Sequence, residues 1–268
     1  MHDSFITALN TQRTTLDWMD AIVKNMSNIY TPGYRETQFN FKTFLDGTSL
    51  DDLNINTGQG KSFPGTSPEN VFLEGNGFFL VRRDDGKILY TRRGEFKFDG
   101  EGVYKTTDGK AVQGYILNEN GEVLAGTKVQ NGDPSQIPTT GIKMWIDPGN
   151  GKYLGKYDEY EIKEDGIIYG KADKGKIKVP LYKIAIQNFH NPSGLREVND
   201  GEYIETDASG KPVAGKGDIR SGLIELSNAD LRANMTYFQQ AKLQMDVSNK
   251  LVSTNKDLLN EVMRLLGS

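Results

Sequence analysis

Residues 4–28 read SFITALNTQRTTLDWMDAIVKNMSN and contain neither glycine nor proline. Apolar side chains recur there at seven-residue steps, in two series: Leu9, Leu16 and Val23, and Met19 and Met26. A seven-residue repeat places an apolar stripe along one side of an α-helix. The stretch therefore predicts an N-terminal helix, which ends where Thr31-Pro32-Gly33 cannot continue it.

The C-terminal part of the chain repeats this pattern over a longer stretch. Ser227 and Asp230 are typical of a helix start, and no further glycine or proline occurs before Gly267. One apolar series again follows a seven-residue step: Phe238, Met245, Val252, Leu259 and Leu266. The companion positions Ala241, Ser248 and Asn255 are small or polar, which suits the close approach of two helices.

Neither stripe can be buried within its own helix, and an isolated amphipathic helix is marginal in water. The simplest arrangement pairs the two helices as a coiled coil. Such a pair still exposes apolar residues on its outer sides, which copies of the chain would cover. The alternative is that both helices pack on the middle of the chain.

The middle of the chain has a different sequence pattern. Tight-turn dipeptides occur repeatedly, at Asp85-Gly86, Asp99-Gly100, Asp108-Gly109, Asn120-Gly121, Asp165-Gly166 and Asp200-Gly201. Short runs rich in aromatic and β-branched residues lie between them: 78–82, 88–91, 96–98, 115–117, 167–169 and 181–187. This pattern predicts an all-β domain of short strands, a sandwich or a barrel.

The predicted fold is thus mixed α and β, with helices flanking an all-β central domain. Residues 1–30 and 225–268 form the paired helices, and residues 31–69 form a connector of irregular or extended structure. Residues 70–224 form the β-rich domain.

Composition narrows the classes of function. A net charge of −4 argues against a nucleic-acid partner, and the apolar runs are too short to span a bilayer, so we expect no membrane insertion. The chain has no cysteine, and its N-terminus lacks the features of a cleaved secretory signal. Two expectations stay open: a cytosolic protein, or one exported without a cleaved signal.

No catalytic, metal or cofactor site is predicted. His190 lies in a turn without a nearby acid or second histidine at ligand spacing, and Gly75-Asn76-Gly77 lacks the third glycine and the helix of a dinucleotide site. We interpret these glycines as backbone positions at a turn or bulge. The acidic residues 158–165 fit a solvated strand edge, and the lysines of residues 171–178 fit a protected edge strand. The chain is therefore expected not to be an enzyme.

Four motifs resemble those of the bacterial flagellar rod and hook proteins, in the same order. They are N-M-S-N-I-Y-T-P-G-Y-R at 25–35, G-N-G-F-F-L-V at 75–81 with Y-T-R-R-G-E-F at 90–96, F-H-N-P-S-G-L at 189–195, and S-N-A-D-L at 227–231. The residues that carry the resemblance are Asn25, Asn28, Thr31, Gly33, Tyr34, Gly75, Gly77, Phe78, Ser227 and Asn228. Ser27 replaces the family's usual alanine, and Gln240 to Leu243 depart from its last-helix pattern.

The resemblance implies a structural subunit that polymerises helically into the axial shaft of the flagellum and transmits torque. Its partners would be copies of itself, other rod and hook subunits, and the type III export apparatus. It would leave the cell without a cleaved signal and reside in the basal body, in the periplasm or cell-wall zone. The expected assembly residues are the two stripes: Leu9, Leu16, Met19, Val23, Met26, Phe238, Met245, Val252, Leu259 and Leu266.

The short stretch between Gly33 and Gly75 favours a proximal-rod-like member, and a distal rod subunit is the alternative within the family. A helical adaptor and a carbohydrate-binding or carbohydrate-active β protein are the alternatives from other classes.

Overall fold

The computed structural model describes residues 2–44, 47–118, 120–123, 139–144, 159–172 and 174–266. The chain divides into two compact units. Unit 1 contains residues 1–29, 36–56 and 229–268, and unit 2 contains residues 30–35 and 57–228. The chain therefore passes from one unit to the other four times.

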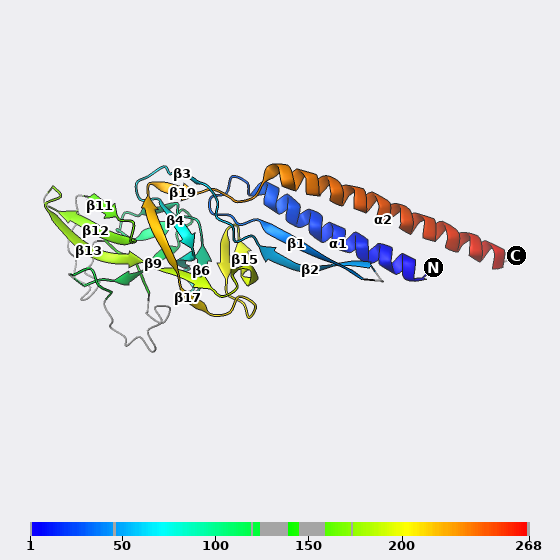
Figure 1. Ribbon diagram of the computed structural model, residues 1–268, viewed down its shortest axis with the longest axis horizontal. Coiled ribbons are helices and arrows are strands. Elements are labelled where there is room, and N and C mark those ends of the chain that lie inside the picture. Colours follow the sequence, from blue (N-terminus) through cyan, green and yellow to red (C-terminus); the bar gives the residue numbers. More distant parts are fainter. Residues whose placement is uncertain are drawn as a thin grey trace. The chain divides into compact units, whose positions relative to one another are not determined.

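Unit 1 consists of two helices and one hairpin (Figure 1). The helices are α1 (His2–Ser27) and α2 (Leu231–Leu266), and the hairpin strands are β1 (Thr37–Phe44) and β2 (Gly47–Ile55). The helices lie side by side and antiparallel, since Gln12 hydrogen-bonds Asn249 and Asn25 hydrogen-bonds Asn234. The hairpin runs along α1.

Local sequence explains where the helices begin and end. The Asp230 carboxylate accepts a hydrogen bond of 3.0 Å from the backbone N–H of Ala233, as expected of a residue at the start of a helix. At the end of α1 the Asn28 side chain donates to the Lys24 carbonyl at 3.0 Å. Gly33 then adopts a φ of +67°, a left-handed conformation that glycine adopts at little cost.

Unit 2 is built from short strands. Their bounds are β3 (Ser62–Pro64), β4 (Val71–Asn76), β5 (Phe78–Arg82), β6 (Ile88–Thr91), β7 (Phe96–Phe98), β8 (Tyr104–Thr106), β9 (Ala111–Ile116), β10 (Thr140–Gly141), β11 (Glu159–Ile162), β12 (Ile167–Ala172), β13 (Ile177–Ile184), β14 (Ile186–Phe189), β15 (Arg196–Asn199), β16 (Glu202–Ile204), β17 (Pro212–Ala214), β18 (Lys216–Ser221) and β19 (Leu223–Glu225), with a 3-10 turn at Pro192–Gly194.

The main sheet of unit 2 has the strand order β11-β12-β13-β9-β5-β6-β16-β15, and its pairings are antiparallel. Strands β18 and β4, and β19 and β3, form separate two-stranded sheets. The described strands do not close on themselves. Of the two architectures expected for this domain, the closed barrel is therefore wrong for the described residues.

A large hydrophobic core lies within unit 2. It is dominated by side chains that are completely buried, among them Phe79, Phe96, Tyr104, Val112 and Ile184. Phe96 lies between the other two aromatic rings, edge-on to Phe79 at 5.3 Å and to Tyr104 at 5.4 Å between ring centroids. Such edge-to-face pairs stabilise a core beyond the area that they bury.

Most of the predicted short strands are present, with two differences of detail. The expected strand over residues 181–187 is divided at Ala185, because the chain leaves β9 there and pairs with β5 instead. In the turn after Asp99, the left-handed residue is Gly102 rather than Gly100. Residues 31–69, which were expected to form a connector of irregular or extended structure, contain the strands β1, β2 and β3.

None of the described helices has the length and apolar character required to cross a bilayer.

Candidate assembly interface

The helices of unit 1 meet through small and polar side chains. Ala8, Thr15 and Ile22 lie seven residues apart on α1 and are buried, and Ala241 and Ser248 of α2 are buried with the same spacing. Around Trp18, Ile22 and Ala241 the contact becomes apolar, and Met19, Met26, Phe39 and Phe238 pack against this cluster. Small side chains let the two helix backbones approach closely.

The expected stripe of α1 is divided between two environments. Met19 and Met26 are half-buried at the edge of the helix contact. Leu9, Leu16 and Val23 lie on the outer side of α1 and are 42%, 54% and 48% exposed. The side of α1 that faces α2 carries Thr15, Trp18 and Ile22 instead, and its signal in the sequence is a second seven-residue series offset by one residue.

The stripe of α2 is likewise divided. Phe238, Met245 and Val252 are half-buried, whereas Leu259 and Leu266 are 47% and 80% exposed. A second exposed series, at seven-residue steps, lies on the outer side of the helix: Leu251, Leu258 and Leu265, with exposed fractions of 51%, 49% and 66%. We call Leu9, Leu16 and Val23 the α1 seam, and Leu251, Leu258 and Leu265 the α2 seam.

Asn25 joins the two helices to the hairpin. Its side-chain amide donates to the Thr37 carbonyl at 2.9 Å and its side-chain oxygen accepts from the Thr37 N–H at 2.9 Å. The same amide donates to Asn234 at 3.2 Å, and both asparagines are completely buried. Asn234 donates in turn to Glu36 at 2.7 Å. Asn25 thus pairs with the backbone of β1 as a neighbouring strand would.

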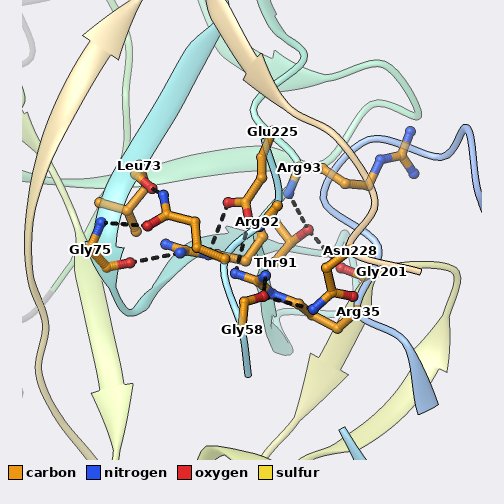
Figure 2. A network of polar contacts seen from close by, with 12 residues as sticks. Arg35, Gly58, Leu73, Gly75, Thr91, Arg92, Arg93, Gly201, Glu225 and Asn228 are labelled. Carbon is orange, nitrogen blue, oxygen red and sulfur yellow. Dashed lines mark hydrogen bonds and ion pairs between the residues drawn. The ribbon is translucent and has the colours of Figure 1, made fainter. Parts of the chain in front are cut away.

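In unit 2, two arginines of the quoted motifs converge on one buried carboxylate, that of Glu225 (Figure 2). Arg35 Nη2 lies 2.9 Å and Arg92 Nε lies 3.2 Å from its oxygens, and all three side chains are at most 3% exposed. The backbone N–H of Gly60 donates to the same carboxylate at 2.7 Å. We call these three side chains the Glu225 cluster.

The two arginines of the cluster also bind carbonyl oxygens. Arg35 donates to Gly58, and Arg92 donates to Gly75 at 2.6 Å (Figure 2). Burial lowers the pKa of Arg92 to about 10, against the opposing effect of Glu225, and burial also lowers the pKa of Arg35. Burial of a charge is tolerated where it is paired, and here one carboxylate is shared by two guanidinium groups.

The Glu225 cluster fixes the segments through which the chain enters and leaves unit 2. The Gly33 N–H donates to the Glu225 carbonyl at 2.8 Å, and the Asn228 N–H donates to the Tyr34 carbonyl at 3.3 Å. The Asn228 side chain donates at 2.7 Å to the Gly58 carbonyl that Arg35 also contacts. Residues 33–35, 58–60 and 225–228 are therefore held together inside one unit.

The glycines of the motifs are required by the backbone. A Cβ on Gly33 would lie 2.4 Å from the backbone nitrogen of Arg93. Gly75 and Gly77 have φ values of +111° and +135°, and they flank the junction between β4 and β5. Gly75 and Asn76 pair in regular register with Gly217 and Lys216 of β18, so the interpretation as turn or bulge positions is wrong for these two, and only Gly77 lies between two strands. Phe78, which follows, is buried edge-on to Tyr203 at 5.9 Å and to Phe189 at 6.3 Å.

The remaining motif residues lie in the segments that follow α1 and precede α2. Asn28 is buried at the end of α1, Tyr34 is completely buried, and Thr31 and Ser227 are half-buried. The sequence reasoning missed Arg35, Arg92 and Glu225 as a group. Both arginines stand inside quoted motifs, but Glu225 lies just before one and has no motif of its own.

The histidine and the charged stretches that the sequence analysis considered lie outside the Glu225 cluster. His190 is exposed, and the described residues contain no cluster of three or more His, Cys, Asp or Glu side chains. Lys171 and Lys178 lie 3.0 and 2.9 Å from Glu161 of the outermost strand β11. These hydrogen bonds lower the pKa of Glu161 to about 2. Lys171 of β12 and Lys178 of β13 lie opposite each other on neighbouring strands.

Comparison with known proteins gives a consistent picture. Residues 72–170 match the family described as "Flagellar hook protein FlgE/F/G D1 domain". The chain is 25% identical to the flagellar basal-body rod protein FlgG of Borreliella burgdorferi, over 90% of each chain. It is 24% identical to FlgG of Bacillus subtilis, over 92% of each chain. The flagellar hook protein FlgE of Borreliella burgdorferi is 35% identical over 47% of this chain and 29% of its own.

The motifs, the match to the D1 domain within unit 2, and the relatives aligned over nearly their full length agree with one another. Along nearly its whole length the chain is therefore similar to the flagellar rod and hook proteins.

Proposed function

We propose that this chain is a structural subunit of the flagellar basal-body rod, which polymerises helically into the axial shaft and transmits torque. The observation that carries the proposal is the pair of exposed seams, Leu9, Leu16 and Val23 on α1 and Leu251, Leu258 and Leu265 on α2. Relatives aligned over about nine-tenths of their length bear the name basal-body rod protein, which supports it.

Both seams repeat every seven residues and are about half exposed. Helices with this repeat pack side by side through the apolar series, so the seam of one copy fits the seam of another. A contact between two different surfaces of identical chains extends as a filament when it does not close into a ring. Within each copy, we propose that α1 and α2 pair as a coiled coil. Residues 1–30 and 225–268 would then be the polymerisation domain, and residues 70–224 would be the outer domain.

The role proposed is structural rather than enzymatic, and the partners are copies of this chain and other rod and hook subunits. Export through the flagellar type III apparatus without cleavage would place the chain in the periplasm or cell-wall zone. Mass spectrometry of the subunit from isolated basal bodies tests this part. An N-terminus shortened by the removal of a leader would contradict it.

The seams are tested by a matched pair of triple variants in cells that carry this chain as their only copy of the subunit. Replacing Leu9, Leu16 and Val23 with Gln removes the α1 seam. Replacing Asn10, Arg13 and Lys24 with Gln changes three exposed positions of the same helix outside the seam. We expect only the seam variant to lose rod assembly and motility, with unit 2 still folded by near-UV circular dichroism. Normal rods from the seam variant would contradict the proposal.

A position near the cell end of the rod is our more specific proposal, with the distal part as the alternative. The short stretch between Gly33 and Gly75 supports it. Immunogold labelling of isolated rods distinguishes the two, because label near the hook would favour the distal assignment.

A further inference from the structure

The helical face that α2 presents to α1 continues beyond their contact. Ala241 and Ser248 are buried on this face, and Met245 and Val252 flank them. The same face carries Leu259, Met263 and Leu266 in the last turns of the helix, where they are 47%, 70% and 80% exposed. The register set by Gln12 and Asn249 places these residues at and beyond the level of His2. We call them the α2 tip.

Elsewhere in unit 1 a groove opens between α1, β1 and α2. It has a volume of about 510 Å³ and is lined by Trp18, Glu36, Thr37, Gln38, Phe39, Tyr237 and Gln240. Trp18 and Phe39 form its aromatic floor, edge-on to each other at 6.3 Å between centroids. Tyr237 is 43% exposed at its wall. The groove adjoins the apolar cluster in which Trp18 meets Ala241.

We propose that the groove receives the α2 tip of a second copy of this chain, so that successive copies join head to tail. The inference rests on the proposed function, since it names the partner surface of the same polymer. A protruding apolar helix end and an open aromatic groove are complementary, and both belong to the same chain. Methionine is well suited to the contact, because its thioether sulfur interacts favourably with aromatic rings.

Charge supports the same occupant. Among the described residues that line the groove, Glu36 carries the acidic side chain, which accepts hydrogen bonds from Asn234 at 2.7 Å and Asn56 at 3.3 Å. Arg264 follows Met263 in the sequence, about 100° further round the helix, and its 2.8 Å ion pair with Glu261 is exposed on both sides. An exposed pair of this kind is worth little, so Arg264 can turn towards Glu36 of the neighbouring copy at small cost.

A single chain cannot make this contact with itself. Gln240 and Met263 lie on one helix, and a rise of 1.5 Å per residue separates them by roughly 35 Å. The groove and the tip are different surfaces, so the contact is heterologous and repeats along a filament.

Disulfide cross-linking tests the proposal directly, because the natural chain has no cysteine. In the variant Gln240→Cys with Met263→Cys, each copy carries one groove thiol and one tip thiol. A disulfide forms only when the Cα atoms come within about 7 Å, so a bond between these positions must join two copies. Mild oxidation of rods assembled in cells is expected to give a ladder of dimers, trimers and larger species on non-reducing gels.

Two controls make the result specific. Either single-cysteine variant can give at most a dimer. The pair Lys211→Cys with Met263→Cys moves the first thiol to a side chain of unit 2 that is 90% exposed, and it is expected to give no ladder. Rods that assemble and support motility but give no ladder from the groove and tip pair would overturn this inference and leave the proposed function intact. A natural chain that never enters rods would overturn the proposed function itself.

A substitution provides the second readout. Met263→Asp places a charge that would have to be buried against Trp18 and Phe39, and it is expected to lower incorporation into rods on the order of tenfold. Lys256→Asp, at an exposed position of the same helix, is the matched control and should leave incorporation unchanged. Equal incorporation of the two variants would count against the groove as the binding site.

Discussion

Arg35 and Glu225 form an ion pair of 2.9 Å whose side chains are only 3% and 1% exposed. The two residues are far apart in the sequence, one shortly after α1 and the other shortly before α2. Their contact fixes, inside unit 2, two of the segments by which the chain crosses between units. Residues 35 and 225, which lie close to two of these crossings, are therefore joined within unit 2 by a buried charge cluster.

Glu225→Gln is expected to reduce the free energy of unfolding of unit 2 by about 3–5 kcal/mol, because it leaves two buried guanidinium groups without a compensating charge. Urea unfolding followed by circular dichroism measures this change in the free energy of unfolding. The matched control is Glu74→Gln, which breaks the Arg220–Glu74 pair at 2.5 Å between half-exposed side chains. Its effect on stability is expected to be small, because an exposed ion pair contributes little. Similar losses in the two variants would contradict the importance of burial.

Asn25→Ala is expected to release the start of β1. The substitution leaves the Thr37 N–H and carbonyl without the partners that now lie at 2.9 Å. The loss should be about 1–3 kcal/mol, the cost of leaving buried polar groups unpaired. Amide hydrogen exchange at Thr37 is the measurement, and faster exchange is expected there. Ser27→Ala, which removes a hydroxyl that bonds only within α1, should leave this amide unchanged.

Gly33→Ala tests the need for glycine in the segment between α1 and β1. The new Cβ would meet the backbone of Arg93 at 2.4 Å, in addition to the strain of a φ of +67°. Gly86→Ala is the control, because φ there is +84° and nothing lies within 4 Å of the new Cβ. The strain alone costs about 1–2 kcal/mol, so Gly86→Ala should lower the free energy of unfolding by that amount and Gly33→Ala by clearly more. Equal decreases in the melting temperatures of the two variants would show that the structure easily relieves the contact between the new Cβ at residue 33 and the backbone of Arg93.

The regular parts of this fold could be predicted because they follow from local pattern. Pro32 and Gly33 follow the end of α1, and glycines with positive φ at Gly86, Gly109 and Gly166 mark turns between paired strands. The Glu225 cluster could not be predicted in the same way. Its members are brought together by the course of the chain, and a single glutamate before a helix carries no periodic signal.

The division of the stripes is a related case. A seven-residue repeat shows which residues share a side of a helix, but not which of two adjacent sides meets the partner helix. On α1 the more apolar series, with Leu9 and Leu16, lies outside, whereas Thr15 and Ile22 face inward. Small residues at a helix contact allow closer backbone approach, and this steric factor competes with hydrophobicity in choosing the inner side.

Acid should weaken the pairing of the edge strand β11 over a defined range of pH. Lys178 and Lys171 lower the pKa of Glu161 from 4.5 to about 2. A carboxylate whose pKa is lowered by folding adds stability above its unfolded pKa, and this stability is lost as the pH falls towards the folded value. The contribution of Glu161 is therefore fully present above about pH 5 and disappears progressively between about pH 4.5 and 2.

Amide exchange of the β11–β12 pair between Glu161 and Tyr169 measures this loss locally, since Glu161 is one-third exposed and its effect on global stability is small. Natural chain and Glu161→Gln are compared at pH 6 and pH 3. The natural chain should exchange faster than the intrinsic pH effect predicts at the lower pH, whereas the variant should show no such excess. An excess of equal size in both chains would assign the acid sensitivity to other carboxylates and not to the lysine pair on Glu161.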